Sequence, residues 1–325
     1  MSNGTVLVTN DLEEKFTATS IAQFVFLATM FLFAVAGNGL VCYIVYRFKH
    51  LRTVPNALIV NLSVIDLFNS LVNMPLFVSF YIFRLDVFKG KWITYVFSSL
   101  HNYIIYLNVL TLMALMADRY GAIAFKFRYH SWKTKKKAYR GIALIWVTGT
   151  VLIISLGFYR DRILSHYEDL PLMEYRRILY KTGGWKVALA LFGAPLVVIT
   201  VLGGLIWRSV KASRKRIEDL TGRDECTSQG KKMLDLLRKK EIQTTRNIII
   251  VVVTYFVCFV PAMALGICLR RDITVPWLEY FAFFCSYLTS ACSPIVYSLR
   301  TCRFKQVIRE LFTPNRNRPV FPVEL

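Results

Sequence analysis

Residues 21–46 read IAQFVFLATMFLFAVAGNGLVCYIVY, and no charged side chain lies between Lys15 and Arg47. The hydrocarbon core of a bilayer is about 30 Å thick, and a helix needs roughly 20 apolar residues to cross it. The stretch is therefore long enough and apolar enough for one crossing. It predicts a transmembrane helix rather than one helix of a globular core.

Six later stretches have the same character. Thr53–Phe83 contains one charged residue, Asp66, and Trp92–Ala117 contains none. Four further stretches are uncharged, namely Gly141–Tyr159, Val187–Trp207, Asn247–Leu269 and Tyr280–Leu299. We therefore expect an all-α membrane protein, with an N-terminal tail (1–20), a seven-helix transmembrane bundle (21–299), and a short amphipathic helix with a cytoplasmic tail (300–325). The seven spans are expected at about 21–46, 54–83, 92–120, 141–159, 187–207, 245–269 and 275–299.

The distribution of basic residues orients this bundle. The chain has 325 residues, 55% of them hydrophobic, with 41 Lys and Arg against 20 Asp and Glu. Four connections expected on one side hold 29 of these Lys and Arg, in segments 47–52, 118–140, 208–246 and 300–325. Because cytoplasmic connections are rich in Lys and Arg, the N-terminus is expected outside and the C-terminus in the cytosol. This asymmetry explains the net charge of +21, so nucleic acid is not expected as a partner.

Asp66 is the one acidic residue expected near the middle of a span. A carboxylate in a bilayer is costly and is usually functional. Other spans offer polar partners for it, and these are Asn38, Asn108, Ser290 and Ser293. The cluster would hold either a cation or a protonated carboxyl that joins helices, and the sequence leaves both interpretations open.

Three polar residues follow one face of the third span. His101, Asn108 and Arg119 are separated by 7 and 11 residues, which at about 100° per residue returns them to the same side of a helix. His101 would line an outer cavity and Arg119 would lie about 27 Å away at the cytosolic mouth. The alternative for His101 is a packing residue without ligand contact.

Prolines interrupt three later spans. Pro195, Pro261 and Pro294 fall in the fifth, sixth and seventh spans. Proline frees a backbone carbonyl and kinks a helix, so we expect hinges at these positions.

Short motifs occur in a fixed order along the spans, and the set resembles the rhodopsin-like (class A) G-protein-coupled receptors over about residues 21–312. The motifs are Gly37-Asn38, Asn61 with Asp66, Asp118-Arg119-Tyr120, Trp146, Pro195, Cys258-Phe259-Val260-Pro261, Ser293-Pro294-Ile295-Val296-Tyr297 and Arg303-Phe304. The resemblance implies a plasma-membrane receptor that converts binding of an extracellular small molecule, lipid or peptide into activation of a heterotrimeric G protein. It also implies arrestin as a further partner.

The resemblance assigns roles to single residues. Arg119 would pair with Asp118 and with Glu241, and this pairing would hold the inactive state. Outward movement of the sixth helix would then free Arg119 for the G protein. Asp66 would form a sodium pocket with Asn108, Ser290 and Ser293, and Tyr297 would swing inward on activation.

Several positions depart from the family pattern. Thr94 stands near the position of an expected cysteine, and residues 156–186 contain no cysteine, so the usual outer disulfide cannot form. The second outer loop would then be either mobile or held by its mixed charges. Phe259, Ser293 and Gly203 replace a usual tryptophan, asparagine and tyrosine, so the resemblance does not extend to these three switch positions.

The ligand is only partly constrained by the sequence. No lysine lies between Thr274 and Leu299, which excludes a retinal Schiff base there. The rim expected for the pocket consists of His101, Phe259, Phe283 and Tyr287. His101 stands where amine receptors of this family keep an aspartate, so an amine ligand is disfavoured and a lipid or small acid is slightly favoured.

Two modification sites and two alternative functions complete the expectations. Asn3 begins a glycosylation sequon, and Cys302 lies in the basic amphipathic segment, where palmitoylation is plausible. We find no catalytic or metal-ligand constellation, so an enzyme is not expected.

The alternatives to a signalling receptor are a non-signalling or constitutively active seven-helix scaffold and an ion- or proton-coupled transporter.

Overall fold

The computed structural model describes residues 17–83, 91–125, 128–129, 134–164, 172–221, 236, 249–250, 252–254, 256–257 and 259–300. Three sites expected from sequence, Asn3, Glu241 and Cys302, lie outside these residues, as does the amphipathic helix expected after Arg300.

Every regular element in the described residues is helical. The α-helices are α2 (Ala18–Arg47), α3 (Val54–Phe68), α4 (Met74–Phe77), α5 (Lys91–Ala124), α7 (Lys135–Leu164), α8 (Leu172–Leu179), α9 (Trp185–Ala188), α10 (Ala194–Thr221) and α12 (Pro276–Arg300). Short turns of other helix types join or extend them, namely η1 (Lys49–Leu51), η2 (Asn69–Asn73), η3 (Val78–Ile82), η5 (Tyr180–Gly184) and η6 (Leu189–Gly193).

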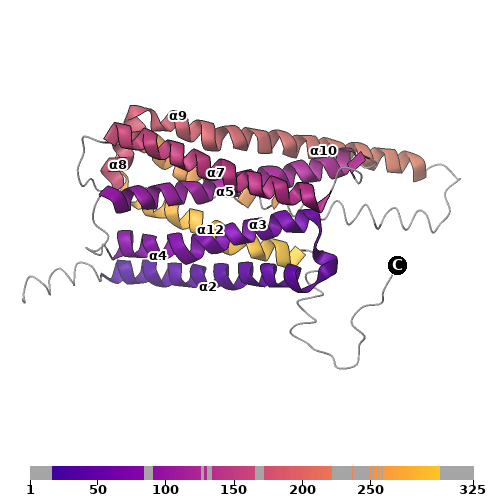
Figure 1. Ribbon diagram of the computed structural model, residues 1–325, viewed down its shortest axis with the longest axis horizontal. Coiled ribbons are helices and arrows are strands. Elements are labelled where there is room, and N and C mark those ends of the chain that lie inside the picture. Colours follow the sequence, from indigo (N-terminus) through magenta and orange to yellow (C-terminus); the bar gives the residue numbers. More distant parts are fainter. Residues whose placement is uncertain are drawn as a thin grey trace, which may run out of the picture.

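The long helices lie side by side along the longest axis of the molecule (Figure 1). α5 packs against α3, α7 and α10, and α2 packs against α3 and α12. α5 therefore has neighbours on several sides, which places the polar face expected on the third span inside the bundle.

Six helices in the described part of the chain are long and apolar enough to cross a membrane, namely Ala18–Arg47, Val54–Ile82, Tyr95–Ala124, Lys135–Ile163, Ala194–Ala212 and Val252–Arg270. The second of them is continuous through α3, η2, α4 and η3. α12, which occupies the seventh expected span, is not one of the six, but it has 25 residues and lies against α2.

Close backbone approach joins α2 to α12. A Cβ atom built on Gly37 would lie 2.5 Å from Cγ of Pro294, a distance that real side chains do not adopt. Glycine is therefore required here by the proximity of the two helices. Pro294 thus sits at a helix contact as well as inside α12.

A buried amide joins three other helices. Asn61 of α3 accepts a hydrogen bond from Nε1 of Trp146 on α7 (2.9 Å) and donates to Oγ1 of Thr111 on α5 (2.9 Å). Both polar ends of the amide are satisfied, so the contact fixes the relative position of α3, α5 and α7.

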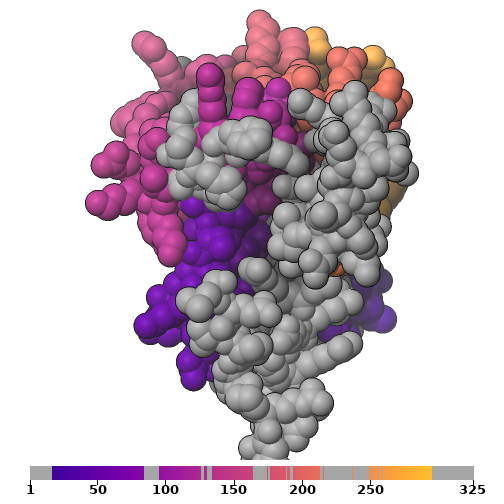
Figure 2. Space-filling model, turned by 90° about the vertical axis from the view of Figure 1, so that its right-hand side faces the viewer, coloured from indigo at the N-terminus to yellow at the C-terminus, as the bar shows by residue number. Residues whose placement is uncertain are grey.

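The bundle has two ends, which are named here by what lies at them. The α8 end is where α2, α5 and α12 begin and where α8 lies. The Arg119 end is where α2, α5 and α10 finish, and Figure 2 views the molecule from that end.

Candidate functional site

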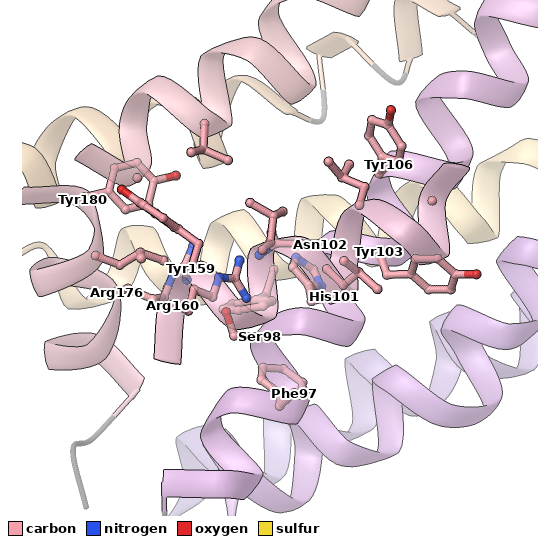
Figure 3. Close-up of a pocket in the computed structure, with 18 residues that line it drawn as sticks. Phe97, Ser98, His101, Asn102, Tyr103, Tyr106, Tyr159, Arg160, Arg176 and Tyr180 are labelled. Atoms are coloured by element: carbon pink, nitrogen blue, oxygen red, sulfur yellow. The ribbon is translucent and has the colours of Figure 1, made fainter. Parts of the chain in front are cut away.

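A cavity of about 70 Å³ lies at the α8 end, between α5, α7, α8 and α12. Its wall combines aromatic rings with polar and basic groups, among them His101, Tyr103, Tyr106, Arg160, Arg176 and Phe283. Figure 3 shows Arg160 and Arg176 on one side of it and His101 and Tyr103 on the other.

Of the four rim residues expected from sequence, two line the cavity and two do not. His101 and Phe283 line the cavity, and their rings are 4.7 Å apart. Tyr287 does not line it, because this side chain is fully buried one turn further along α12, with its hydroxyl donating to the carbonyl oxygen of Asn73 (3.4 Å). Phe259 packs instead against a separate apolar cluster that includes Leu112.

Neither Arg160 nor Arg176 is among the pocket residues expected from the sequence. The uncharged stretch ends at Tyr159, which predicts a loop at Arg160, but α7 continues to Leu164. Arg160 is only 5% exposed, and its Nη1 donates to Oγ of Ser99 on α5 (3.0 Å). The signal that could have found it is helical phase, since Arg160 follows Gly149, Ile153 and Leu156, which also line the cavity.

Arg176 reaches the cavity from α8. Its Nη1 donates to Oε1 of Glu279 on α12 (3.4 Å), and its guanidinium lies 5.4 Å from the ring centre of Phe283. The same Glu279 oxygen also accepts a hydrogen bond from the hydroxyl of Tyr81 (2.6 Å). Glu279 is therefore already engaged by two donors from different elements.

Ion pairs hold α8 and η5 against the turn that follows Val252–Arg270. Oδ1 of Asp272 lies 3.1 Å from Nε of Arg177, and Oδ2 accepts from Nζ of Lys181 at 2.7 Å. The hydrogen bond from Lys181 is the main cause that lowers the pKa of the Asp272 carboxyl, and the charges of Lys181 and Arg177 act in the same direction. Asp272 has a φ of 64°, a left-handed conformation that Asp adopts more readily than most residues.

These ion pairs act where the disulfide implied by the resemblance cannot form. Residues 156–186 contain no cysteine, and Cys268, close to Asp272 in sequence, is a free thiol. Of the two expectations for this loop, the described part agrees with a segment held by its charges.

A chain of buried side chains leads from the cavity into the bundle. Nδ2 of Asn73 lies 3.1 Å from Nδ1 of His101 and also donates to Oδ1 of Asn69 (2.9 Å). Nδ2 of Asn69 donates to Oγ of Ser290 (3.0 Å). Oγ of Ser290 in turn donates to Oδ1 of Asp66 (2.9 Å). Three residues, Asn73, Asn69 and Ser290, thus connect His101 to the Asp66 carboxylate in the middle of the bundle.

Asn69 and Asn73 were not among the residues expected from sequence. They follow Asp66 by three and seven positions, a spacing that places residues on one helix face, so the signal was present. The π-helical turn η2 covers both, and such turns are frequent at functional sites.

The other residues expected around Asp66 differ in what they contact. Asn108 donates weakly to Oδ1 of Asp66 (3.5 Å), and Asn38 donates to the carbonyl oxygen of Ser290 (2.9 Å). Ser293 donates to the carbonyl oxygen of Thr289 one turn earlier on its own helix (2.8 Å).

The donor set near Asp66 fits a hard cation such as Na⁺. Such ions prefer carboxylate, amide and hydroxyl oxygens. Oδ1 of Asn38, Oδ1 of Asn108 and Oγ of Ser63 are buried and accept no hydrogen bond in the described part of the chain. Buried oxygen atoms that are left without a hydrogen-bond donor are suitable cation ligands, and Asn108 contacts Asp66 through its Nδ2.

The Arg119 end holds the expected charged motif. Nη2 of Arg119 lies 2.8 Å from Oδ2 of Asp118, and both side chains are largely buried. Oδ1 of Asp118 accepts a hydrogen bond from the hydroxyl of Tyr129 (2.5 Å). Nε of Arg119 is buried and has no partner within the described residues. Tyr120 packs edge-on against Phe125.

The remaining switch residues are only partly described. Pro261 lies inside Val252–Arg270, and Pro294 lies inside α12 against Gly37. The backbone of Tyr297 belongs to α12, but its side chain, like the whole of Glu241, is outside the described residues.

The profile of the family "7 transmembrane receptor (rhodopsin family)" matches residues 37–297, which include the polar chain and both ends of α5. This chain belongs to the rhodopsin family of seven-transmembrane receptors. Its fold is therefore a seven-helix transmembrane bundle, and it is a multi-pass membrane protein. The expected class of protein, a G-protein-coupled receptor, is confirmed.

Individual members of the family are similar over most of the chain. Neuromedin-U receptor 2 of Rattus norvegicus is 24% identical over 91% of this chain and 78% of its own length. Somatostatin receptor type 5 of Rattus norvegicus is 25% identical over 86% of this chain and 75% of its own length. Histamine H2 receptor of Homo sapiens is 26% identical over 93% of this chain and 83% of its own length.

These similarities favour a signalling receptor over the two alternatives kept open from sequence. Each of the three relatives is a receptor named for a ligand, and none is a transporter or a scaffold. The rhodopsin family consists of receptors rather than enzymes.

Proposed function

We propose that this receptor lies in the plasma membrane with its N-terminus outside, and that a ligand in the cavity at the α8 end activates a heterotrimeric G protein at the Arg119 end. The observation that carries this proposal is that α5 contributes residues to both sites. His101 on α5 lines the cavity, and Arg119 lies in the ion pair at its other end. The Lys and Arg of the connections expected on the Arg119 side support a cytosolic position for that end.

The route between the two sites is the polar chain from His101 to Asp66. A ligand that displaces His101 changes the position of Asn73, and the shift reaches Ser290 on α12 through Asn69. Buried polar networks have discrete hydrogen-bonded arrangements, so they can switch between two states. The inactive state would be the arrangement described here.

A sodium ion at Asp66 would stabilise that inactive arrangement. Asp66 and Ser290 would hold it, with Asn108 supplying a further oxygen. When bound, Na⁺ supplies a positive charge that compensates the buried carboxylate. The unpartnered amide oxygen of Asn108 supports this assignment.

Release of Arg119 would be the output step. In the described residues Asp118 holds Arg119, and Glu241 at the start of the sixth span would add a second carboxylate. Semi-buried pairs of this kind are suitable latches because they can exchange one partner for another. The freed guanidinium would then contact the G protein, and arrestin would use the same face.

The relatives do not settle the ligand. Their names refer to peptides in neuromedin-U and somatostatin receptors and to an amine in the histamine receptor. A protonated amine needs an acidic partner, and among the described residues that line the cavity none is Asp or Glu. The cavity therefore supports a ligand other than an amine.

Nucleotide exchange on a panel of purified G proteins tests the proposal. Wild-type receptor in lipid nanodiscs should accelerate exchange on at least one G protein, and Arg119→Ala should abolish the acceleration. Arg140→Ala is the matched control, because Arg140 is an exposed arginine near the same end of the bundle. Equal exchange by wild type and Arg119→Ala, on any G protein that responds, would contradict the proposed output site.

Orientation and modification have separate tests. We expect an N-terminal epitope to be accessible on intact cells and a C-terminal epitope only after permeabilisation. Asn3→Gln should remove a glycosidase-sensitive mass, and Cys302→Ser should remove any incorporated palmitate. The opposite epitope pattern would overturn the proposed orientation.

A further inference from the structure

Arg160 is a buried cation, and within the described residues its charge is not matched by an acid. Its side chain is 5% exposed and lines the cavity, and its hydrogen bond to Ser99 uses one of five N–H donors. A guanidinium stays protonated in proteins. Within the described part of the chain no carboxylate pairs with it. A buried charge without a counter-charge is strongly unfavourable, so this arrangement is the one that a bound anion would complete.

The other charges around the cavity do not cancel that of Arg160. Arg176 is already paired with Glu279, and Glu279 is also engaged by Tyr81. The adjacent Asp161 is exposed on the surface of α7 and does not line the cavity. His101 is neutral or positive, so it adds no negative charge. Among the described residues, the groups that line the cavity therefore carry an excess of positive charge.

The uncharged part of the cavity wall would suit a small organic group that is attached to the anion. Tyr103, Tyr106 and Tyr159 surround the polar groups, together with apolar residues of α7. A volume of about 70 Å³ corresponds to roughly five to seven water molecules, at about 10–15 Å³ each. This space accommodates a carboxylate or phosphate group with a few attached atoms, but not a long acyl chain.

We propose that the ligand of this receptor is a small organic oxyanion whose charged group is bound by Arg160, with Arg176 as a second donor. The planar fork of a guanidinium binds carboxylate and phosphate oxygens in a bidentate manner. The aromatic wall selects the rest of the molecule. This inference rests on the proposed function only in taking the cavity as the ligand site.

Arg160 has an alternative role that the test must separate. Its hydrogen bond to Ser99 joins α7 to α5 and could serve packing alone. Ser99→Ala removes that bond and keeps the charge. Arg160→Gln keeps a side-chain N–H donor near Ser99 and removes the charge. The two variants therefore distinguish an anion site from a packing contact.

The experiment measures binding of defined probes to the full-length receptor in nanodiscs, by thermal shift and by saturation-transfer NMR. The probes are straight-chain carboxylates from acetate to palmitate, the alcohols of equal length, and the matching phosphate monoesters. Comparison of carboxylates with phosphates identifies the anionic group, and chain length separates a small acid from a lipid. Arg162→Gln is the matched control, because Arg162 is an exposed arginine on the same helix and does not line the cavity.

We expect at least one short-chain anion to bind, and its alcohol not to bind. Arg160→Gln should weaken that binding by about tenfold or more, since charge-assisted hydrogen bonds are lost. Ser99→Ala and Arg162→Gln should keep the affinity within about twofold, as expected for changes outside the anion contact. The proposal is overturned if no anion binds a folded receptor, if alcohols bind as well as acids, or if Arg160→Gln binds like the wild type.

Failure of this inference can be told apart from failure of the proposed function. The binding assay contains no G protein, and the exchange assay with Arg119→Ala needs no ligand. An Arg119-dependent basal exchange without anion binding would leave the receptor function intact and overturn the anion site. Anion binding through Arg160 without any G-protein response would support the anion site and overturn the proposed receptor function.

Discussion

Nδ2 of Asn73 lies 3.1 Å from Nδ1 of His101, so a side chain of the cavity wall is in direct contact with the next member of the polar chain that ends at Asp66. Asn73 also carries a hydrogen bond to Asn69, and its backbone carbonyl accepts from Tyr287. It therefore contacts α5 and α12 at once. A movement of His101 cannot leave the centre of the bundle unaffected.

Asn73→Ala should destabilise the receptor by about 1–3 kcal/mol, because it leaves Oδ1 of Asn69 buried without that donor. Thermal unfolding in detergent, followed by intrinsic fluorescence, measures the change. Asn102→Ala is the control, since Asn102 lines the cavity but is not part of the polar chain. Equal melting temperatures for the two variants would show that the chain contributes no net stability.

Gly37→Ala should destabilise the bundle by about 1–3 kcal/mol, as overpacked substitutions do, because its Cβ would lie 2.5 Å from Pro294. Gly39→Ala, two residues along the same helix, meets nothing within 4 Å. That substitution should instead stabilise by about 0.5–1 kcal/mol, through a better helix propensity. Gly37→Ala should therefore lower the melting temperature and Gly39→Ala should raise it. Shifts of the same sign in the two variants would refute the close approach of α2 to α12.

The fold was predictable because length and lack of charge are sufficient signals for membrane-crossing helices. The common face of His101 and Arg119 on α5 was predictable for a similar reason, since helical phase is nearly constant along one helix. Sequence alone could not locate the end of α7, because a helix can continue past its last apolar residue into water. The charge pattern therefore predicts a loop at Arg160, although this residue lies on α7 and lines the cavity.

The candidate site was predicted less completely than the fold. Phe259 and Tyr287 were placed at the rim from the resemblance alone, and the rotation of each helix about its own axis depends on tertiary packing. Tyr287 faces inward onto Asn73, and its place at the rim is taken by residues of α7 and α8. Such contacts between distant segments are not encoded in any local periodicity.

Asp118→Asn should raise basal nucleotide exchange by up to about fivefold. The substitution removes the charge that holds Arg119 at 2.8 Å, and a latch worth about 1 kcal/mol shifts a two-state equilibrium by that order. Asp118→Glu keeps the charge and should stay close to wild type. Lower exchange by Asp118→Asn than by wild type would mean that Asp118 promotes rather than restrains activation.

Asp272→Asn should loosen α8, because it removes the carboxylate that Arg177 and Lys181 share. Asn tolerates the left-handed backbone at this position, so only the charge is lost. Hydrogen exchange of residues 172–184 should become faster in Asp272→Asn. Asp161→Asn, at an exposed position of α7, should leave it unchanged. The same loosening should occur in wild type only as the pH falls through the lowered pKa of Asp272, below the ordinary value of 3.8, since the contact is complete above it.

Replacement of Na⁺ by choline should lower the melting temperature of wild-type receptor, because a ligand bound only by the folded state stabilises it by mass action. Asp66→Asn should abolish this dependence, since the carboxylate is the only charged ligand of the proposed site. Potassium in place of choline controls for ionic strength. A sodium dependence that persists in Asp66→Asn would place the ion elsewhere.

The central claim is that the cavity and the Arg119 end are coupled, and coupling between two sites is reciprocal. Hydrogen exchange of wild-type receptor with and without a nucleotide-free G protein, chosen from those that respond in the exchange assay, measures it directly. We predict slower amide hydrogen exchange in residues 172–184, beside the cavity, when the G protein binds at the Arg119 end. This effect should be lost in Asn73→Ala. Binding of the G protein that protects only residues near Arg119, with no change beside the cavity, would contradict the account.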